Sequence, residues 1–451
     1  MRFRFLSLAL VGLLALPATT SAQQTISFDD AVRIALEQNV SLQRSRNSVE
    51  LQSTSVTQAR AQRLPSLNLS SSTGRNWGLQ FDLTTGRLEN QSSDRFSLNA
   101  SSGVTLFNGF AIGASIDQAE SSLAAQEAAY RRSEQAVVFS VITNYLQVIL
   151  DQETIRIRQE DLEAQQSQLE RIIEFVRVGQ RPISDQYTQE VSVANSEAAL
   201  LNAQTGLQLS ETRLISTLQL DPLNSYTFTA PSAEEVALTA RSYDPDELLR
   251  AAYDARADLS AQEYSIEAAE AGITIAKSSM LPRVSFNAGM GTSYSSFGRD
   301  PLTGQQAAFG DQLSDNRSQN VGLSVSVPIF NRFQTRTSVE RAEVQLNNAR
   351  LDLENLQQSI ALEVRQAYLD YQTAVKRLEV TEKQLQAARQ ALEVEQARYD
   401  VASSTLVELT QARASFVNAE RSRIQAIFQF HLQHRLIEYY LGVLNPSEPL
   451  F

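Results

Sequence analysis

The sequence predicts a mixed α and β membrane protein in which long paired helices carry a small group of membrane-spanning β-strands. Three observations predict this class. The chain is an internal duplication, several segments alternate apolar with small polar residues, and two helical segments are far longer than a globular domain holds. There is no cysteine, only two histidines and no glycine-rich phosphate loop, so we expect neither an enzyme nor a cofactor.

The duplication is visible in one repeated phrase. TLFNGF at residues 105–110 returns as PIFNRF at residues 328–333, 223 positions later. The same offset relates Tyr145 to Tyr368, and an offset of 217 relates Pro65 to Pro282. A period of about two hundred residues is too long for a solenoid repeat. We therefore expect two homologous halves, at residues 23–220 and 247–443. A linker at residues 221–246 joins them, and a tail at residues 444–451 follows the second half.

The first 22 residues, MRFRFLSLALVGLLALPATTSA, have the pattern of a secretory signal peptide. Arg2 and Arg4 precede an apolar run at residues 6–16, and small residues end the segment before Gln23. A single membrane anchor is the alternative, but the run is shorter than the ~18 apolar residues of a spanning helix. No other segment has such a run.

Charge and composition exclude several function classes. The chain has 39 Lys and Arg against 51 Asp and Glu, and no basic stripe, which argues against nucleic-acid binding. The lack of cysteine excludes disulfides and thiolate metal sites. His431 and His434 are three apart on a predicted helix, but no third ligand type is near, so we favour a surface or packing role over a metal site.

Each half has the same predicted order of elements: helix, strand, polar segment, strand, long helix, turn and helix. Pro65 and Pro282 end the first helices because proline removes a donor and restricts the residue before it. In the first half we place the elements at residues 30–62, 66–72, 74–94, 95–109, 111–178, 178–182 and 184–220. In the second half they lie at residues 247–279, 283–294, 295–319, 321–331, 335–402, 401–405 and 406–443.

The strand segments have a period of two. Val284 and Phe286 alternate with Ser285 and Asn287, a pattern that fits either a soluble sandwich or a transmembrane barrel with a polar lumen. Strands of about 10–13 residues, a signal peptide and long polar loops favour the barrel. Four strands per chain cannot close a barrel, since small barrels need about eight, and open edges are not tolerated in lipid. Several chains must therefore pool their strands.

The long helices add a second geometric constraint. Residues 111–178 and 335–402 each span 68 positions, about 100 Å of helix. Val364, Tyr371 and Leu378 recur every seven residues, which is typical of a coiled-coil seam. We expect the shorter helices to stack end to end beside the long ones, with the strands at one end of a rod and the turns at the other.

This plan resembles the TolC-like outer-membrane efflux protein family over essentially the whole mature chain. The resemblance is carried by the Leu-Pro pairs at residues 64–65 and 281–282, the FNG and FNR junctions, and the turn phrases RVGQRPISDQYTQ and RYDVASSTLVELTQAR. It implies a homotrimer whose twelve pooled strands form one β-barrel in outer-membrane lipid. It also implies that the helices form a coiled-coil barrel across the periplasm of a diderm bacterium.

The resemblance implies a passive exit duct for efflux or type I secretion, driven by an inner-membrane transporter through a periplasmic adaptor. Drug, metal ion, polysaccharide and protein all stay open as cargo, because a duct selects little. The alternative is a non-channel periplasmic scaffold or adhesin stalk of coiled coils, whose strands form a soluble sheet. Outer-membrane location and a hollow trimer would separate the two.

The resemblance further implies a gate at the far tip of the rod. Asp185 matches the acidic residue after the first turn, Tyr399 the tyrosine that helps to hold the gate shut, and Glu408 the first of two acids that ring the aperture. Such a ring would attract cations. For Asp185 and Glu408 the alternative is a solvated carboxylate near a helix start, where the helix dipole favours it.

This sequence departs from the family pattern at two gate positions. Gln411 replaces the second aperture acid and Ser404 replaces the gate arginine, for which Arg181 could substitute. Small and turn-forming residues make the expected adaptor-docking tip: Gly179, Pro182, Ala402 and Ser403.

Aromatic residues mark the expected membrane boundaries. At the strand-to-helix junctions an interfacial girdle, or simply local packing, is expected from Phe107, Phe110, Phe330 and Phe333. In or near the external loops we expect Trp77, Phe81, Tyr294 and Phe297.

Overall fold

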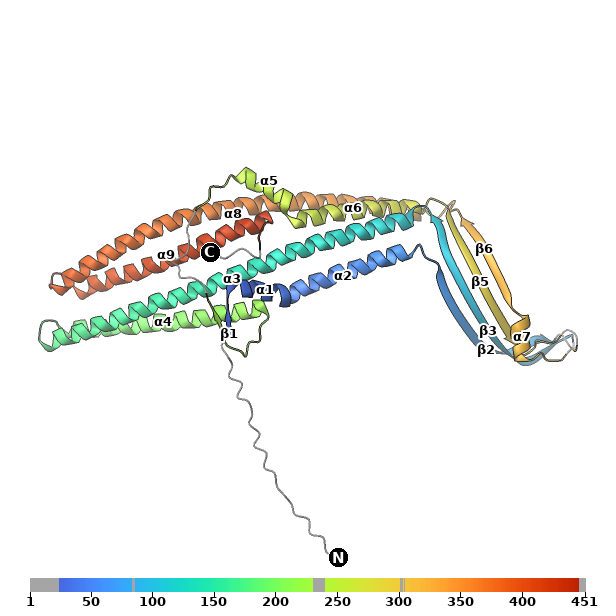
Figure 1. Cartoon of the computed structure of the whole chain (residues 1–451), viewed down its shortest axis with the longest axis horizontal. Coiled ribbons are helices and arrows are strands. Elements are labelled where there is room, and N and C mark those ends of the chain that lie inside the picture. The colour runs from blue at the N-terminus through green and yellow to red at the C-terminus, as the bar shows by residue number, and fades with distance from the viewer. Residues whose placement is uncertain (1–23, 83–85, 230–239, 301–302, 304, 446–451) are drawn as a thin grey trace, which may run out of the picture.

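The computed structural model describes residues 24–82, 86–229, 240–300, 303 and 305–445. The predicted signal peptide, the middle of the linker and the end of the tail lie outside these residues. A rod of long helices carries a β-sheet at one end, and the hairpin turns lie at the other (Figure 1). No helix in the described ranges is both long enough and apolar enough to cross a membrane.

Two helical hairpins make the length of the rod. In the first, α3 (Ala111–Arg177) turns into α4 (Ile183–Leu218), and in the second, α8 (Gln334–Asp400) turns into α9 (Leu406–Leu441). Each long helix has 67 residues and each return helix has 36. At 1.5 Å per residue the long helices extend about 100 Å.

Shorter helices complete the half of the rod that lies next to the sheet. Next to α3 lie α1 (Phe28–Gln38) and α2 (Val40–Ala61), and next to α8 lie α5 (Pro245–Ala255) and α6 (Ala257–Ser278). A small parallel pair, β1 (Gln24–Ile26) and β4 (Tyr226–Phe228), crosses the middle of the rod. The Tyr145 hydroxyl fixes this pair through contacts of 3.1 and 2.5 Å with the carbonyl oxygens of Ile26 and Thr229.

The two halves share one backbone plan. Both helices of the second hairpin begin and end 223 residues after those of the first, and α5 and α6 follow α1 and α2 by 217. The left-handed residues repeat as well: Gly179 and Ala402 have φ of 75° and 60°, and Gln219 and Gly442 have φ of 55° and 74°. Each of these residues ends a helix, where a left-handed residue turns the chain away.

The prediction of unbroken helices at residues 30–62 and 247–279 was wrong. Asn39 is extended, and its side chain accepts from the N–H groups of Ser41 and Leu42 at 3.0 and 3.2 Å, so it ends α1 and caps α2. In the second half Arg256 is likewise extended between α5 and α6. In each half a single extended residue therefore breaks a helix that the wider pattern describes as continuous.

The sheet is antiparallel, in the order β2 (Ser66–Asp82), β3 (Arg87–Asn108), β5 (Arg283–Ser295), β6 (Ser318–Ser326). The register places most of its large apolar side chains together on one side, which we call the apolar face. Its members include Leu67, Leu69, Leu98, Ala100, Phe286, Met290, Val321, Leu323 and Val325. The opposite, polar face carries small side chains such as Asn99, Asn287 and Ser324.

The prediction of a polar loop at residues 74–94 was also wrong, because β2 and β3 pair far beyond the end of β5. Arg75 and Asp94 form a two-pronged ion pair across this hairpin, with contacts of 2.5 and 2.7 Å. Trp77 and Phe81 therefore lie on a strand and are exposed. In the second half the expected loop contains a short helix, α7 (Phe309–Asp315). Backbone ladders and polar cross-strand pairs need no apolar alternation.

Candidate functional site

The turns at the tip are the first part of the candidate site. Val178 and Gly179 follow α3, and Val401 and Ala402 follow α8. The two valines are 58% and 74% exposed, and a Cβ built on Gly179 would meet no atom within 4 Å. These positions therefore present small and apolar groups to the surroundings of the chain.

Behind the turns a small hydrophobic cluster joins the two hairpins. Ile172 of α3 packs in one cluster with Tyr399 of α8 and with Leu406 and Leu409 of α9, and all four are buried. Because these residues come from both hairpins, separating the hairpins at the tip would expose them. The cluster thus holds the two hairpins of this chain together at the tip.

Arg181 adds a polar contact between the two hairpins. Its guanidinium carbon lies 4.1 Å from the centre of the Tyr399 ring, and its Nη2 donates to the Tyr399 carbonyl oxygen at 2.6 Å. An arginine over an aromatic face gains a cation–π interaction. The Tyr399 hydroxyl is buried and has no hydrogen-bond partner among the described residues. Within this chain, then, Arg181 rather than Asp185 bonds to Tyr399.

Glu408 has a local role as well as an exposed position. Thr405 and Glu408 form a capping box at the start of α9, with the carboxylate accepting from the Thr405 N–H at 2.9 Å. These bonds hold the pKa of the Glu408 carboxyl below its ordinary value, led by the backbone bond from Thr405 and followed by Ser404. Glu408 therefore stays ionised in neutral solution.

Ser404, where the resemblance implies an arginine, lies between two carboxylates. Its Oγ is 2.7 Å from Glu395 and 2.8 Å from Glu408. Glu395 also pairs with Arg398 at 2.6 Å. Sequence reasoning missed Glu395, although its i,i+3 spacing from Arg398 on a helix was an available signal.

Three further predicted residues lie at or near the tip: Asp185, Gln411 and Ser403. Asp185 is half-buried in the first turn of α4 and its N–H donates to the Pro182 carbonyl at 3.0 Å. Gln411 is exposed on α9, one turn beyond Glu408. Ser403 closes the second turn through a bond of 3.0 Å to the Arg398 carbonyl.

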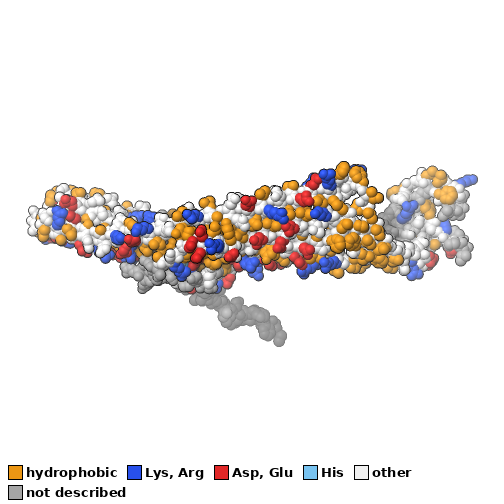
Figure 2. Space-filling view, turned by 90° about the horizontal axis from the view of Figure 1, so that it is seen from above, with side chains coloured by type: hydrophobic (Ala, Val, Ile, Leu, Met, Phe, Trp, Pro, Cys, Tyr) orange, Lys and Arg blue, Asp and Glu red, His pale blue; other side chains and the backbone are white. Residues whose placement is uncertain are grey.

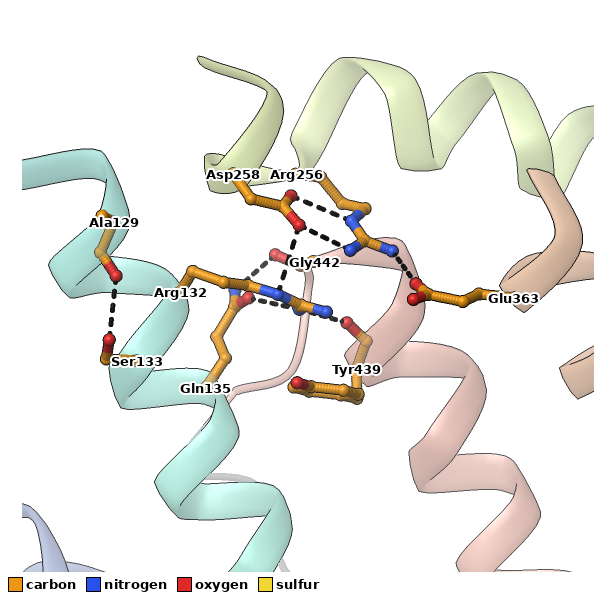
Figure 3. A network of polar contacts seen from close by, with 9 residues as sticks. All are labelled: Ala129, Arg132, Ser133, Gln135, Arg256, Asp258, Glu363, Tyr439 and Gly442. Atoms are coloured by element: carbon orange, nitrogen blue, oxygen red, sulfur yellow. Dashed lines mark hydrogen bonds and ion pairs between the residues drawn. The ribbon is translucent and has the colours of Figure 1, made fainter. Parts of the chain in front are cut away.

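A second polar cluster, missed by sequence reasoning, ties four helices together at the middle of the rod (Figure 3). Arg256 is 4% exposed and binds Asp258 of α6 at 2.6 and 3.0 Å and Glu363 of α8 at 2.6 Å. Arg132 of α3 lies 3.7 Å from Asp258, stacks on the Tyr439 ring at 4.0 Å and donates to the Tyr439 carbonyl. No periodic pattern marks these residues, because they meet only through tertiary packing.

Charge balance explains how this mid-rod cluster is buried. Burial raises the pKa of the Asp258 carboxyl, but the hydrogen bonds and charge of Arg256 outweigh that effect and hold the pKa below its ordinary value. Two arginines thus face two carboxylates. Breaking such a buried set is costly because it leaves an unpaired charge.

The repeated FN phrases form matched junctions between strands and long helices. The rings of Phe107 and Phe110 meet edge to face with centroids 5.3 Å apart, and those of Phe330 and Phe333 at 5.7 Å. Gly109 has a φ of 67°, and a Cβ there would come within 2.5 Å of the Ser278 carbonyl oxygen of α6. Only glycine allows this approach.

The two histidines lie on α9 in the middle of the rod. His431 is buried, and burial lowers its pKa to about 4, with smaller contributions from His434 and Arg435. The described residues contain no group of three or more histidine, aspartate or glutamate side chains arranged to hold a metal ion.

Comparisons with known proteins identify a matching family and a related sequence. The sequence profile of the family described as "Outer membrane efflux protein" matches residues 31–218 and 248–437. The outer membrane protein TolC of Escherichia coli is 24% identical over 333 residues, which cover 73% of this chain and 66% of that relative. The chain thus matches slightly under two thirds of that relative's length.

Solved structures share the fold. A membrane protein from Pseudomonas aeruginosa superposes with a TM-score of 0.77 at 20% identity, covering 92% of each chain. The outer membrane protein VceC of Vibrio cholerae superposes with a TM-score of 0.74 at 20% identity, covering 92% of this chain and 96% of the other.

Proposed function

The chain belongs to the outer membrane efflux protein family, and from this premise we propose that three copies form a passive exit duct in the outer membrane. Each copy contributes its four-stranded sheet to one twelve-stranded barrel and its helices to a periplasmic tunnel. An inner-membrane transporter supplies the energy, and a periplasmic adaptor connects that transporter to the tip.

The observation that carries this proposal is the state of the sheet. Neither outer edge of the sheet has a partner strand among the described residues, since β2 pairs only with β3 and β6 only with β5. On the apolar face Val321, Leu323 and Val325 are 77%, 63% and 62% exposed. Lipid suits that face, but an open edge in lipid costs several kcal/mol for each unpaired backbone group. Pairing β2 with β6 of neighbouring copies satisfies both requirements.

The outside of the rod supports lateral contacts between copies. Val344, Leu351, Leu362 and Leu369 of α8 are 60%, 54%, 71% and 45% exposed, and they form two pairs with seven-residue spacing. Figure 2 shows hydrophobic side chains gathered over the end of the rod next to the sheet. Exposed apolar surface of this extent marks an interaction site. Coiled-coil contacts between protomers would cover it.

The tip supports a gate. The hydrophobic cluster of Ile172, Tyr399, Leu406 and Leu409 and the Arg181 contact hold the two hairpins of one copy together. In a trimer, Glu408 would be present three times around the aperture and would remain ionised. Three carboxylates in a constriction favour cations.

Outer-membrane fractionation followed by planar-bilayer recording tests this function. We expect a heat-modifiable trimer in the outer membrane that conducts ions with cation selectivity. Glu408→Gln should weaken that selectivity and Gln411→Asp should strengthen it. A soluble periplasmic protein without conductance would instead indicate a coiled-coil scaffold or stalk.

A further inference from the structure

A crevice of about 270 Å³ lies on the apolar face of the sheet, beneath α7. Its floor includes Leu69, Leu98, Ala100 and Met290 from three strands, and Leu313 of α7 also lines it. The lining is thus mostly apolar, with one charged side chain, which is discussed below. An apolar hollow on a face proposed to meet lipid calls for an apolar occupant.

The cover of the crevice is held rigidly. Because β6 begins opposite Gly291, the last four residues of β5 have no β6 partner, and α7 takes their open edge. Gln312 is 5% exposed, and its amide both donates to and accepts from the Ser295 backbone at 3.0 Å. Thr292 Oγ1 also donates to the Leu313 carbonyl at 2.7 Å. These bonds fix α7 over the sheet.

The height of the crevice follows from the aromatic residues. Phe309 of α7 contacts Tyr294 and Phe96, with ring centroids 5.0 and 5.6 Å away, near the end of β5 remote from the helices. Tyr294 is ten residues along β5 from Val284, the partner of Phe107 at the inner junction. Ten residues rise about 33 Å along a strand, or about 25 Å when the strand is tilted as in outer-membrane barrels. The two aromatic levels thus bracket one apolar band, and the crevice lies just inside its outer boundary.

A positively charged side chain, Arg317, lines the crevice. Arg317 is exposed, and its Nε donates to the Ser314 carbonyl at 2.7 Å, which orients the guanidinium. Among the described residues no carboxylate lies within ion-pair distance of Arg317. Guanidinium groups match phosphate geometrically. An apolar slot beside an unpaired arginine is complementary to an acyl chain attached to a phosphate.

We infer that this crevice binds lipid A of the outer leaflet, with an acyl chain beneath Leu313 and a phosphate on Arg317. The inference rests on the proposed function, since it requires the apolar face to lie in the outer membrane. Lipid A is the phosphorylated, multiply acylated glycolipid of that leaflet, so it supplies both chemical groups at the height of the crevice. Bound lipid would brace α7 against the sheet.

Native mass spectrometry and thermal melting of the detergent-solubilised trimer test the inference. We expect lipid A to bind in up to three copies per trimer and to raise the melting temperature, and dephosphorylated lipid A to bind at least about tenfold more weakly. Losing one hydrogen bond to a charged group weakens affinity by about tenfold or more. Arg317→Gln should weaken lipid A binding by a similar factor.

Two further variants separate the crevice from general membrane contact. Ala100→Phe fills the floor with an apolar group, so it should displace the lipid while leaving the trimer intact. Arg299→Gln removes an exposed arginine at the same end of the sheet that does not line the crevice, and it should bind like wild type. Intact trimers that bind lipid A and its dephosphorylated form equally, or equally well in wild type, Arg317→Gln and Ala100→Phe, would overturn the inference. Failure to find any outer-membrane trimer would instead refute the proposed function.

Discussion

Replacing Arg181 with alanine should open the tip of the duct. The substitution removes the cation–π contact at 4.1 Å and the bond to the Tyr399 carbonyl at 2.6 Å. The first is worth about 0.5–2 kcal/mol and the second, as a hydrogen bond from a charged donor, about 1.5–3 kcal/mol. Arg181 is half-buried, so solvent weakens both. About 2 kcal/mol per protomer is a reasonable total, which shifts the closed-to-open equilibrium of each tip roughly 30-fold.

Single-channel recording in planar bilayers measures this shift directly. Arg181→Ala should raise the time spent in high-conductance states, and Arg181→Lys should have an intermediate effect because an ammonium lacks the planar stacking surface. Tyr399→Phe is the matched control: it keeps the ring, and the hydroxyl that it removes has no hydrogen-bond partner among the described residues. If the Arg181→Ala recordings match wild type, or if the Tyr399→Phe recordings match those of Arg181→Ala, the Arg181–Tyr399 contact does not hold the tip closed.

Four further outcomes are expected. Val325→Arg on the apolar face should reduce trimer assembly, at about 2–4 kcal/mol near the membrane midplane, whereas Ser324→Arg on the polar face should assemble normally. Gly179→Trp should abolish export but leave heat-stable trimers in the outer membrane, because a Cβ at this position would meet no atom within 4 Å. Arg256→Ala should destabilise the rod by about 3 kcal/mol, the lower end for breaking a buried pair, seen as a lower melting temperature. Burial lowers the pKa of His431 from 6.5 to about 4, so the unfolded chain binds more protons than the folded chain between these pH values. The free energy of unfolding therefore falls as the pH drops from 6.5 to 4. His431→Leu should reduce this fall, as measured by melting curves across that pH range.

Controls distinguish these effects from general damage. Arg350→Ala breaks an ion pair with Glu270 whose side chains are 58% and 52% exposed, so it should cost far less than Arg256→Ala. Equal losses from the two would remove the mid-rod cluster from the account of stability. Equal assembly of the Val325 and Ser324 variants would reverse the assignment of the faces, and loss of trimer in Gly179→Trp would make the turn structural.

The helical rod could be predicted because its signals extend over many residues. The 223-residue offset and the seven-residue repeat of apolar side chains placed the ends of both long helices within two residues of those observed. The helix breaks could not be predicted in the same way, since each depends on one residue, Asn39 or Arg256, against a continuous pattern. The strands at residues 74–94 were not predicted, because their pairing relies on backbone hydrogen bonds and on polar pairs such as Arg75 with Asp94.

The candidate site was predictable as a place but not as a set of contacts. The resemblance assigned the turns and Arg181, Tyr399 and Glu408 to the tip, and it suggested that Arg181 substitutes for a missing arginine. That Arg181 lies on the Tyr399 ring depends on how two hairpins more than two hundred residues apart meet at the tip. The mid-rod cluster has the same origin, which is why no local pattern marked Arg132 or Glu363. The capping box of Thr405 and Glu408 is local, and its three-residue spacing was a signal in the sequence that was not used.

Cysteine cross-linking between the two edge strands tests most directly whether three copies close one barrel. The chain has no cysteine, so engineered pairs report without background. We would place one cysteine at Ser324 in β6 and scan the polar-face positions Asn68, Ser70 and Ser72 in β2, then oxidise membranes and run non-reducing gels. At one register the duct predicts a disulfide-linked trimer with no larger species. The absence of cross-links at every position, or a ladder extending beyond three copies, would contradict it.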